Sequence, residues 1–209
     1  MPITVKDIVE KVGLSSESIK QVQWGNPVNN TKEGIYIVSM SESPSENEPH
    51  TCKRIPISID LLRNWMTHGE FKIDNKITND VTLIKQRLSK FWLTDENIIY
   101  IGKAPLRKKG GGIGNRIREY YDTLIENHSP HAGGRWIKVL KNLNNMFVYY
   151  IECDHSSDVE AELLDIFGDQ ISKDNKNRLG DSRNFLPFAN LENGKKSRKK
   201  HGLIFKKRR

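Results

Sequence analysis

The sequence lacks a cysteine framework, a secretion signal and a membrane span. Only two of its 209 residues are cysteine, Cys52 and Cys153, and their separation is not that of a metal site. No apolar run approaches the ~20 residues that cross a bilayer, and no segment has a signal-peptide pattern. These absences argue against a disulfide-stabilised scaffold and a membrane protein, and they predict a soluble protein of the reducing cytoplasm.

Acidic residues are missing from one end of the chain. Residues 195–209 hold nine Lys or Arg and no Asp or Glu, so residues 1–194 have a net charge of −1 although the whole chain has +8. We expect such a segment to be mobile and to attract anionic polymers, nucleic acid first. A segment that only increases solubility is the simpler alternative.

Internal repeats are also missing, and the length is typical of one domain with insertions or a small appendage. Residues 2–24 predict two short helices with a turn at Gly13. Their spacing is similar to that of a helix-turn-helix. Because the second helix offers only one basic residue, Lys20, a packing element is favoured over a DNA-reading one.

Three apolar runs predict buried strands: residues 34–38 within "EGIYIVSM", residues 97–102, "NIIYIG", and residues 146–153, "MFVYYIEC". Four other segments predict helices, of which the first has Ser58 as a plausible N-cap: residues 58–67, 80–92, 114–127 and 158–168.

The first two strands contain Gly34-Ile35-Tyr36 and Tyr100-Ile101-Gly102, and with these motifs the chain resembles the GIY-YIG nuclease family from Gly34 to Asn190. The resemblance implies an α/β (α+β) fold, with a small, mainly antiparallel three-stranded sheet flanked by helices. The division expected along the chain is a helical segment at 1–32, a nuclease domain at 33–193 with an insertion at 41–95, and a basic segment at 194–209.

The family places an arginine on the helix after its second motif and a His or Tyr four residues later. In "GNRIREYY" the resemblance gives these positions to Arg116 and Tyr120, which lie about one turn apart on one helix face. Arg118 is the alternative arginine. The apolar residues of this helix predict a core-facing arc with Arg116 beside Tyr120 and Arg118 on the other side, which favours Arg116.

The family also requires a metal-binding glutamate on a later helix, and "SSDVEAELLDIF" offers Glu160 and Glu162. Glu160 falls within the apolar arc of this helix and matches the family cadence E-x-x-L-I, so it is favoured. A carboxylate among apolar neighbours is costly unless it is paired or binds a metal. The alternative is a capping box between Ser157 and Glu160, in which the carboxylate only fixes the start of the helix.

Two further residues belong to the resemblance. Asn190, behind a proline in "LPFAN", matches an asparagine that orders the site, with an ordinary turn as the alternative. Lys103 follows the second motif, as in the "YIGKA" form of restriction-enzyme members. An ammonium close to Tyr36 would favour its phenolate and lower a pKa that is about 10 in a free tyrosine, so Tyr36 is the expected general base. Tyr100 and Tyr120 would position water or phosphate, with Tyr120 as the competing base.

The resemblance implies one divalent ion, Mg²⁺ with Mn²⁺ as a substitute, held by Glu160 and water ligands. Arg116 would neutralise charge on the phosphate that is cleaved. Double-stranded DNA is the implied partner. The residues expected to contact its backbone are Arg107, Lys108, Lys109, His131 and Arg135, although a simple turn is an equal alternative for residues 131–136.

These features together predict a metal-dependent DNA endonuclease, of the restriction type, in the cytoplasm of a prokaryote. The insertion at 41–95 is the candidate element for reading bases. A homodimer on a palindromic site is expected by analogy with such enzymes. A nuclease of homing, mobile-element or repair type and a catalytically inactive nucleic-acid-binding protein are the alternatives.

Overall fold

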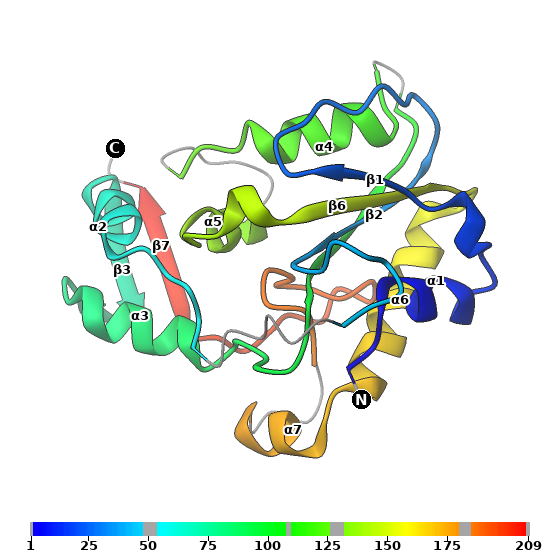
Figure 1. Cartoon of the computed structure of the whole chain (residues 1–209). Coiled ribbons are helices and arrows are strands. Elements are labelled where there is room, and N and C mark those ends of the chain that lie inside the picture. The colour runs from blue at the N-terminus through cyan, green and yellow to red at the C-terminus, as the bar shows by residue number, and fades with distance from the viewer. Residues whose placement is uncertain (1, 48–53, 108–109, 126–131, 180–184, 208–209) are drawn as a thin grey trace.

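The computed structural model describes residues 2–47, 54–107, 110–125, 132–179 and 185–207 (Figure 1). Within them the chain has an α+β fold with two antiparallel sheets. The helices are α1 (Val5–Lys11), α2 (Ile59–Thr67), α3 (Val81–Ser89), α4 (Ile113–Tyr121), α5 (Ala132–Lys138), α6 (Ser156–Gln170) and α7 (Lys173–Leu179). The strands are β1 (Lys20–Gln23), β2 (Gly34–Ser39), β3 (Gly69–Ile73), β4 (Lys76–Thr78), β5 (Ile98–Ala104), β6 (Phe147–Glu152) and β7 (Leu203–Lys207).

The larger sheet contains the three strands that the sequence predicts and one more, in the order β1-β6-β2-β5. β2 lies between β6 and β5 and is antiparallel to both. All of β2 is buried, as suits its β-branched and aromatic side chains. Tyr36 pairs with Gly102 of β5 and with Tyr150 of β6. The two motif-bearing strands are therefore neighbours, although sixty-three residues separate Tyr36 from Tyr100.

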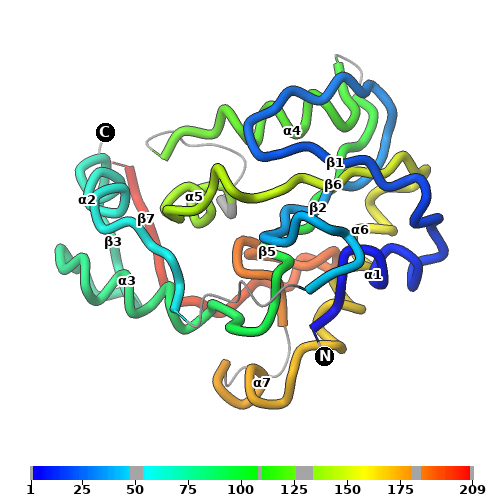
Figure 2. Tube along the Cα trace, viewed as in Figure 1, coloured from blue at the N-terminus to red at the C-terminus, as the bar shows by residue number. Residues whose placement is uncertain are grey.

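Helices cover both faces of this sheet and form two hydrophobic clusters. Alternation along β2 places Tyr36 and Val38 in one cluster, and Ile35 and Ile37 in the other. The first cluster includes side chains of α4 and α5 and continues into α2 and α3, whereas α1 and α6 close the second (Figures 1 and 2). Lys103 stands opposite Ile35 in the register, so the sheet separates it from the face that carries Tyr36.

A second sheet of three strands, β4-β3-β7, lies to one side of the larger one (Figure 2). Its hairpin turns at Asp74 and Asn75, both with positive φ, which is typical of a two-residue hairpin loop. The strand β3 then pairs along its whole length with β7, from the other end of the sequence. The insertion and the basic segment, which look independent in the sequence, thus build one unit.

The expectation that residues 195–209 are mobile is wrong for the described part of that segment. Leu203 is buried, and Phe205 packs against Trp65 and Phe71 with ring centroids 5.5 Å and 5.0 Å away. Within the apolar "LIF" between two basic runs, Leu203 and Phe205 therefore supply free energy that orders the segment, whereas Ile204 is exposed.

The expected pair of N-terminal helices is also wrong in its second half. α1 forms and begins with a capping box between Thr4 and Asp7. After a short 3-10 turn at Ser16–Ser18, however, the chain becomes β1 and pairs with β6. The free edge of β6 provides backbone partners that a second helix would leave unused, so the described residues contain no helix-turn-helix at this position.

Both helices expected inside the insertion form, although α3 ends at Ser89 instead of residue 92. Ser58 caps α2 and Asp80 caps α3, each through its side-chain oxygen. α4 is shorter than expected, and the segment 132–136, for which a turn was the alternative, belongs to the helix α5.

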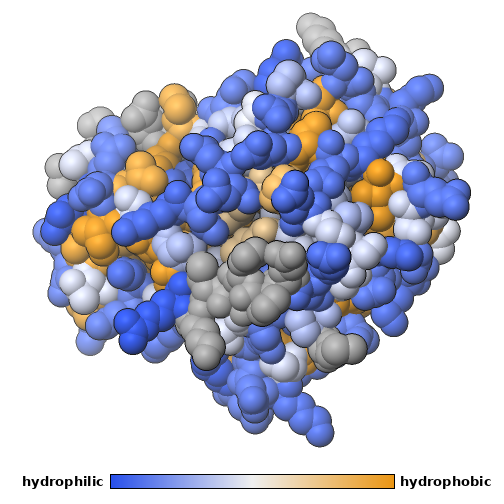
Figure 3. Space-filling view, in the orientation of Figure 1, coloured by the Kyte–Doolittle hydropathy of each residue, from blue (hydrophilic) through white to orange (hydrophobic). Residues whose placement is uncertain are grey.

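No described helix is long and apolar enough to cross a membrane. The face shown in Figure 3 is mostly hydrophilic with separate hydrophobic patches, as suits a chain with 29% charged residues.

Candidate active site

A cavity of about 770 Å³ lies along β5, an edge strand of the larger sheet. We call it the β5 cavity. Side chains from β5, α4, α5, α6 and the segment that follows α7 contribute to it. The residues expected from the sequence that line it are Tyr100, Lys103, Arg116, Arg135, Glu160 and Asn190.

Three tyrosine rings pack together beside this cavity. The ring centroids of Tyr100 and Tyr120 are 4.8 Å apart, and that of Tyr36 is 5.7 Å from Tyr100 and 6.0 Å from Tyr120. Tyr100 lines the cavity, whereas Tyr36 and Tyr120 are fully buried and do not. The two buried rings therefore support Tyr100 rather than facing a ligand.

The two motif glycines are explained by close packing. A Cβ atom on Gly102 would lie 2.6 Å from ring atoms of both Tyr36 and Tyr100, so only glycine lets the rings pack across this strand. A Cβ atom on Gly34 would lie 2.1 Å from the carbonyl oxygen of Ile151 and 2.7 Å from the side chain of Ile113. Gly34 thus allows α4 to begin close to the sheet.

The phenol groups are held in their neutral form. Burial raises the pKa of Tyr36 well above its ordinary value, although Arg116 opposes the shift. Burial raises the pKa of Tyr100 to about 12, and the negative charge of Glu160 adds to this shift. The expectation that Lys103 stabilises a Tyr36 phenolate is wrong, because Lys103 lies on the other face of the sheet and pairs with Glu160.

Glu160, not Glu162, reaches the cavity. Its Oε2 lies 2.9 Å from Lys103 Nζ, and the two side chains are 14% and 35% exposed. Glu162 is exposed and does not line the cavity. The capping-box alternative is excluded, because α6 begins at Ser156, whose backbone N–H donates to Glu33 Oε1 at 2.9 Å. Glu160 therefore lies beyond the first turn, where it cannot cap the helix.

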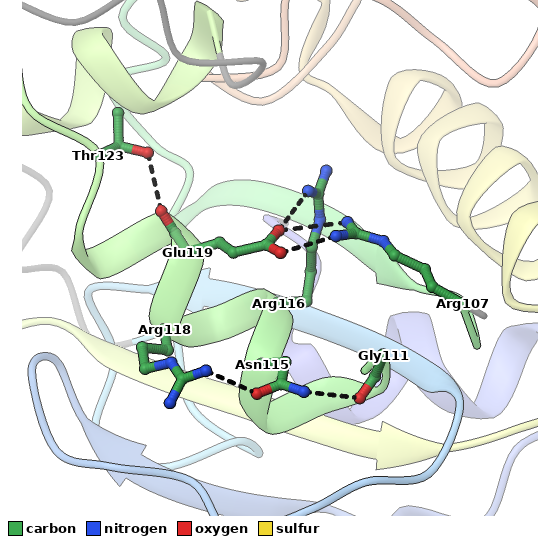
Figure 4. Close-up of polar contacts among 7 residues, drawn as sticks. All are labelled: Arg107, Gly111, Asn115, Arg116, Arg118, Glu119 and Thr123. Carbon is green, nitrogen blue, oxygen red and sulfur yellow. Dashed lines mark hydrogen bonds and ion pairs between the residues drawn. The ribbon is translucent and has the colours of Figure 1, made fainter. Parts of the chain in front are cut away.

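Arg116 is the arginine of α4 that lines the cavity, and a carboxylate holds it there (Figure 4). Glu119 accepts from Arg116 at 2.9 Å and from both terminal nitrogens of Arg107, at 2.6 Å and 3.2 Å. The two arginines hold the pKa of Glu119 below its usual range, although burial alone would raise it. Arg118 instead donates to Asn115 at 2.9 Å and stays outside the cavity.

The glycine-rich segment before α4 serves packing. Gly112 has φ +87, and a Cβ atom on Gly114 would lie 2.1 Å from the carbonyl oxygen of Val28. The backbone N–H of Gly114 donates to the carbonyl of Asn30 at 2.7 Å. The part of this segment that the structure describes therefore fixes the start of α4 against residues 28–32.

The expected DNA contacts fall into three groups. Arg135 lines the β5 cavity. Arg107 is engaged by Glu119 and does not line it. Lys108, Lys109 and His131 lie outside the described residues.

Asn190 has a structural role at the edge of the sheet. Its Oδ1 accepts from the backbone N–H of Ile101 at 2.9 Å, and its Nδ2 donates to the carbonyl of Ile101 at 2.7 Å. The side-chain amide thus takes the place of a neighbouring strand next to Tyr100. Lys199 holds the same segment, since its Nζ donates to the carbonyls of Pro187 and Phe188 at 2.8 Å and 3.0 Å.

Sequence reasoning missed the part of the cavity that the segment 191–205 provides. Lys199, His201 and Phe205 line the cavity, and burial lowers the pKa of Lys199 to about 7 and that of His201 to about 4. The signal that could have found them is the apolar "LIF" inside the basic run. With these residues the lining includes two glutamates, Glu160 and Glu192, and six lysines and arginines: Lys103, Arg116, Arg135, Lys196, Arg198 and Lys199. The cavity therefore favours an anion.

The donor set suits a magnesium ion that keeps most of its water. The described residues hold no group of three or more His, Cys, Asp or Glu that could enclose a metal. Glu160 presents one carboxylate to the cavity, while Glu192 accepts from Arg198 at 3.1 Å. Magnesium is commonly held by one or two carboxylates plus water and phosphate oxygens, so Glu160 could hold it and structural ions with many protein ligands do not fit.

Comparison with known proteins finds no family model, no curated protein and no solved structure that matches the chain.

Proposed function

We propose that the protein is a metal-dependent endonuclease that hydrolyses phosphodiester bonds of double-stranded DNA, of the restriction type. The observation that supports this proposal is the β5 cavity, in which Tyr100, Arg116 and Glu160 lie among six lysines and arginines. These are the residue types that the GIY-YIG resemblance implies, drawn together from separate elements. A polyanion with reactive phosphates is the substrate that such a lining suits.

Three residues have defined tasks in this proposal. Glu160 would hold a divalent ion, which, when bound, supplies charge stabilisation for the phosphate and the leaving oxygen. Arg116 binds the non-bridging oxygens, for which the planar guanidinium is suited, and Glu119 keeps it oriented. Tyr100 is protonated at neutral pH, so its hydroxyl donates a hydrogen bond to the phosphate or orients the attacking water.

Tyr36 changes its role with respect to the sequence-based expectation. It is fully buried, so we assign it the support of Tyr100 instead of direct base catalysis. Tyr120 has the same supporting role from α4. Lys103 compensates the charge of Glu160, which would otherwise repel an approaching phosphate.

A nucleic-acid-binding protein without cleavage is the second candidate. The observation that favours it is the ion pair between Lys103 and Glu160, which engages the carboxylate expected to hold the metal. Metal-dependent cutting separates the two proposals. A homing or repair role would share the same chemistry, and an adjacent DNA methyltransferase gene would argue for restriction instead.

The test is digestion of a supercoiled plasmid by the purified protein with Mg²⁺ and with EDTA. We expect nicked or linear DNA only with the metal. Glu160→Gln should lower the cutting rate at least ~100-fold, as when one charge-stabilising group is removed from an active site. Glu162→Gln, on the same helix but exposed, is the matched control and should cut normally.

The arginines of α4 offer a second matched pair. Arg116→Ala should abolish cutting and Arg118→Ala should leave most of it, because only Arg116 lines the cavity. Cutting that persists in EDTA, or equal loss in both glutamate variants, would contradict the proposed site. Sequencing of the cut ends would then give the recognition sequence and show whether it is palindromic, as a homodimer requires.

A further inference from the structure

Arg135 is a buried cation of the β5 cavity without a described counter-charge. It is only 8% exposed, and it lines the cavity from α5. Its Nε is buried and has no hydrogen-bond partner, and no described carboxylate forms an ion pair with its guanidinium. A buried charge without a counter-charge opposes folding.

Four other basic residues of the cavity have a partner for their charged group, although the Nε of Arg116 is also buried without a hydrogen bond. Three of them pair with a carboxylate: Lys103 with Glu160, Arg116 with Glu119, and Arg198 with Glu192. Lys199 donates to two backbone carbonyls instead. Arg135 is thus a buried cation whose hydrogen-bonding capacity the surrounding protein does not use.

Packing alone does not explain an arginine at this position. The guanidinium carbon of Arg135 lies 5.3 Å from the centroid of the Phe205 ring, and Trp136 lies next to it in the chain and also lines the cavity. Burial lowers the pKa of Arg135, which shows that the surroundings disfavour its charge. A leucine or methionine would fill such a site without this penalty, so the charge needs a reason outside the folded chain.

We propose that Arg135 forms a second phosphate subsite, which binds a phosphodiester group of the substrate strand other than the one held at Arg116 and Glu160. A guanidinium suits this ligand because its planar fork donates two parallel hydrogen bonds to phosphate oxygens. The ring of Phe205 orients the guanidinium, so the segment 191–205 completes the subsite. This inference rests on the proposed function for the identity of its ligand.

The experiment measures binding of a duplex oligonucleotide in EDTA, with Glu160→Gln as the background so that no cutting interferes. Arg135→Met is compared with Arg135→Lys and with the charge-matched control Arg118→Met, which changes a residue outside the cavity. Affinity is recorded across a range of salt concentrations. One phosphate contact contributes about 0.9 to the slope of log K against log salt concentration.

We expect Arg135→Met to lower that slope by about 0.9 and Arg135→Lys to restore most of it. Arg118→Met should change the slope less than Arg135→Met. A thermal melt of Arg135→Met should show an unchanged or raised midpoint, because the variant removes an uncompensated charge. Free inorganic phosphate should raise the melting midpoint of the parent but not of Arg135→Met.

A slope that Arg135→Met leaves unchanged would overturn the subsite, whatever its effect on stability. Failure of the subsite can be distinguished from failure of the nuclease proposal. If the wild type fails to cut DNA with Mg²⁺ but the slope falls, the subsite stands and the nuclease proposal fails. If the wild type cuts and the slope is unchanged, the nuclease proposal stands and Arg135 serves packing only.

Discussion

Asn190 gives the sharpest test of how the edge of β5 is held. Asn190→Ala removes both hydrogen bonds to Ile101, at 2.9 Å and 2.7 Å, and leaves the backbone N–H and carbonyl of Ile101 without these partners. Asn190 is 5% exposed and Ile101 is fully buried, so water has little access. A buried donor or acceptor left unsatisfied costs ~1–3 kcal/mol, which gives about 2–6 kcal/mol for the pair.

The assay is urea unfolding followed by tryptophan fluorescence, with a thermal melt beside it. For a chain of this size the loss corresponds to a fall in melting temperature on the order of 10 °C. Asn145→Ala, at an exposed position, is the matched control and should change the free energy of unfolding by less than ~0.5 kcal/mol.

Asn190→Asp separates the two bonds. The carboxylate keeps the acceptor but loses the donor to Ile101, and it places a negative charge against a carbonyl. Such a carboxyl has a raised pKa in the folded state, so the variant should be most stable at acidic pH and lose stability as the pH rises. An Asn190→Ala variant within ~0.5 kcal/mol of wild type would refute the strand-replacement role.

Three other perturbations test separate parts of the structure. Gly102→Ala should destabilise by ~1–3 kcal/mol and lower cutting, because the new methyl group overlaps two tyrosine rings. Glu96 is 2% exposed, and burial raises its pKa from 4.5 to about 8. The free energy of unfolding should therefore fall as the pH rises between those values. Glu96→Gln should remove this dependence and be the more stable protein at pH 9. Deleting residues 203–209 should cost at least the ~2–5 kcal/mol of one buried leucine, since Leu203 is lost with β7.

For each of these three variants, one measured result would contradict the expectation. Normal melting and cutting by Gly102→Ala would mean that the tyrosine rings move apart without cost. Parallel pH profiles of the free energy of unfolding for wild type and Glu96→Gln would show that this carboxyl ionises freely in the folded state. A truncated protein that melts like the full chain, but binds DNA less tightly, would restore the original view of a mobile basic segment.

The sequence was sufficient to predict those elements and site residues whose position depends on a local pattern of residues. The apolar runs placed β2, β5 and β6, and the side-chain oxygen of Ser58 marked a helix start that the structure confirms. The period of the α6 helix was enough to favour Glu160 over Glu162 for the cavity. The same reasoning separated Arg116 from Arg118.

It failed where distant segments decide the structure. "KQVQ" at β1 carries one apolar residue, and only the edge of β6 makes it a strand. The face on which Lys103 emerges depends on the register with β2, which no local pattern reveals. α5 contains Gly133 and Gly134, which are poor helix formers, so its helix was not expected.

The pairing of β3 with β7 has a consequence for the order in which the protein is made. Gly69 pairs with Lys207, so the partner strand β7 is synthesised well over one hundred residues after β3. At ~5–20 residues per second, a ribosome needs at least several seconds to supply it. During that interval Trp65 and Phe71 lack the cover of Phe205, and the nascent chain has neither its second sheet nor the basic side of the β5 cavity. The lining of the cavity is therefore complete only after translation has passed Phe205.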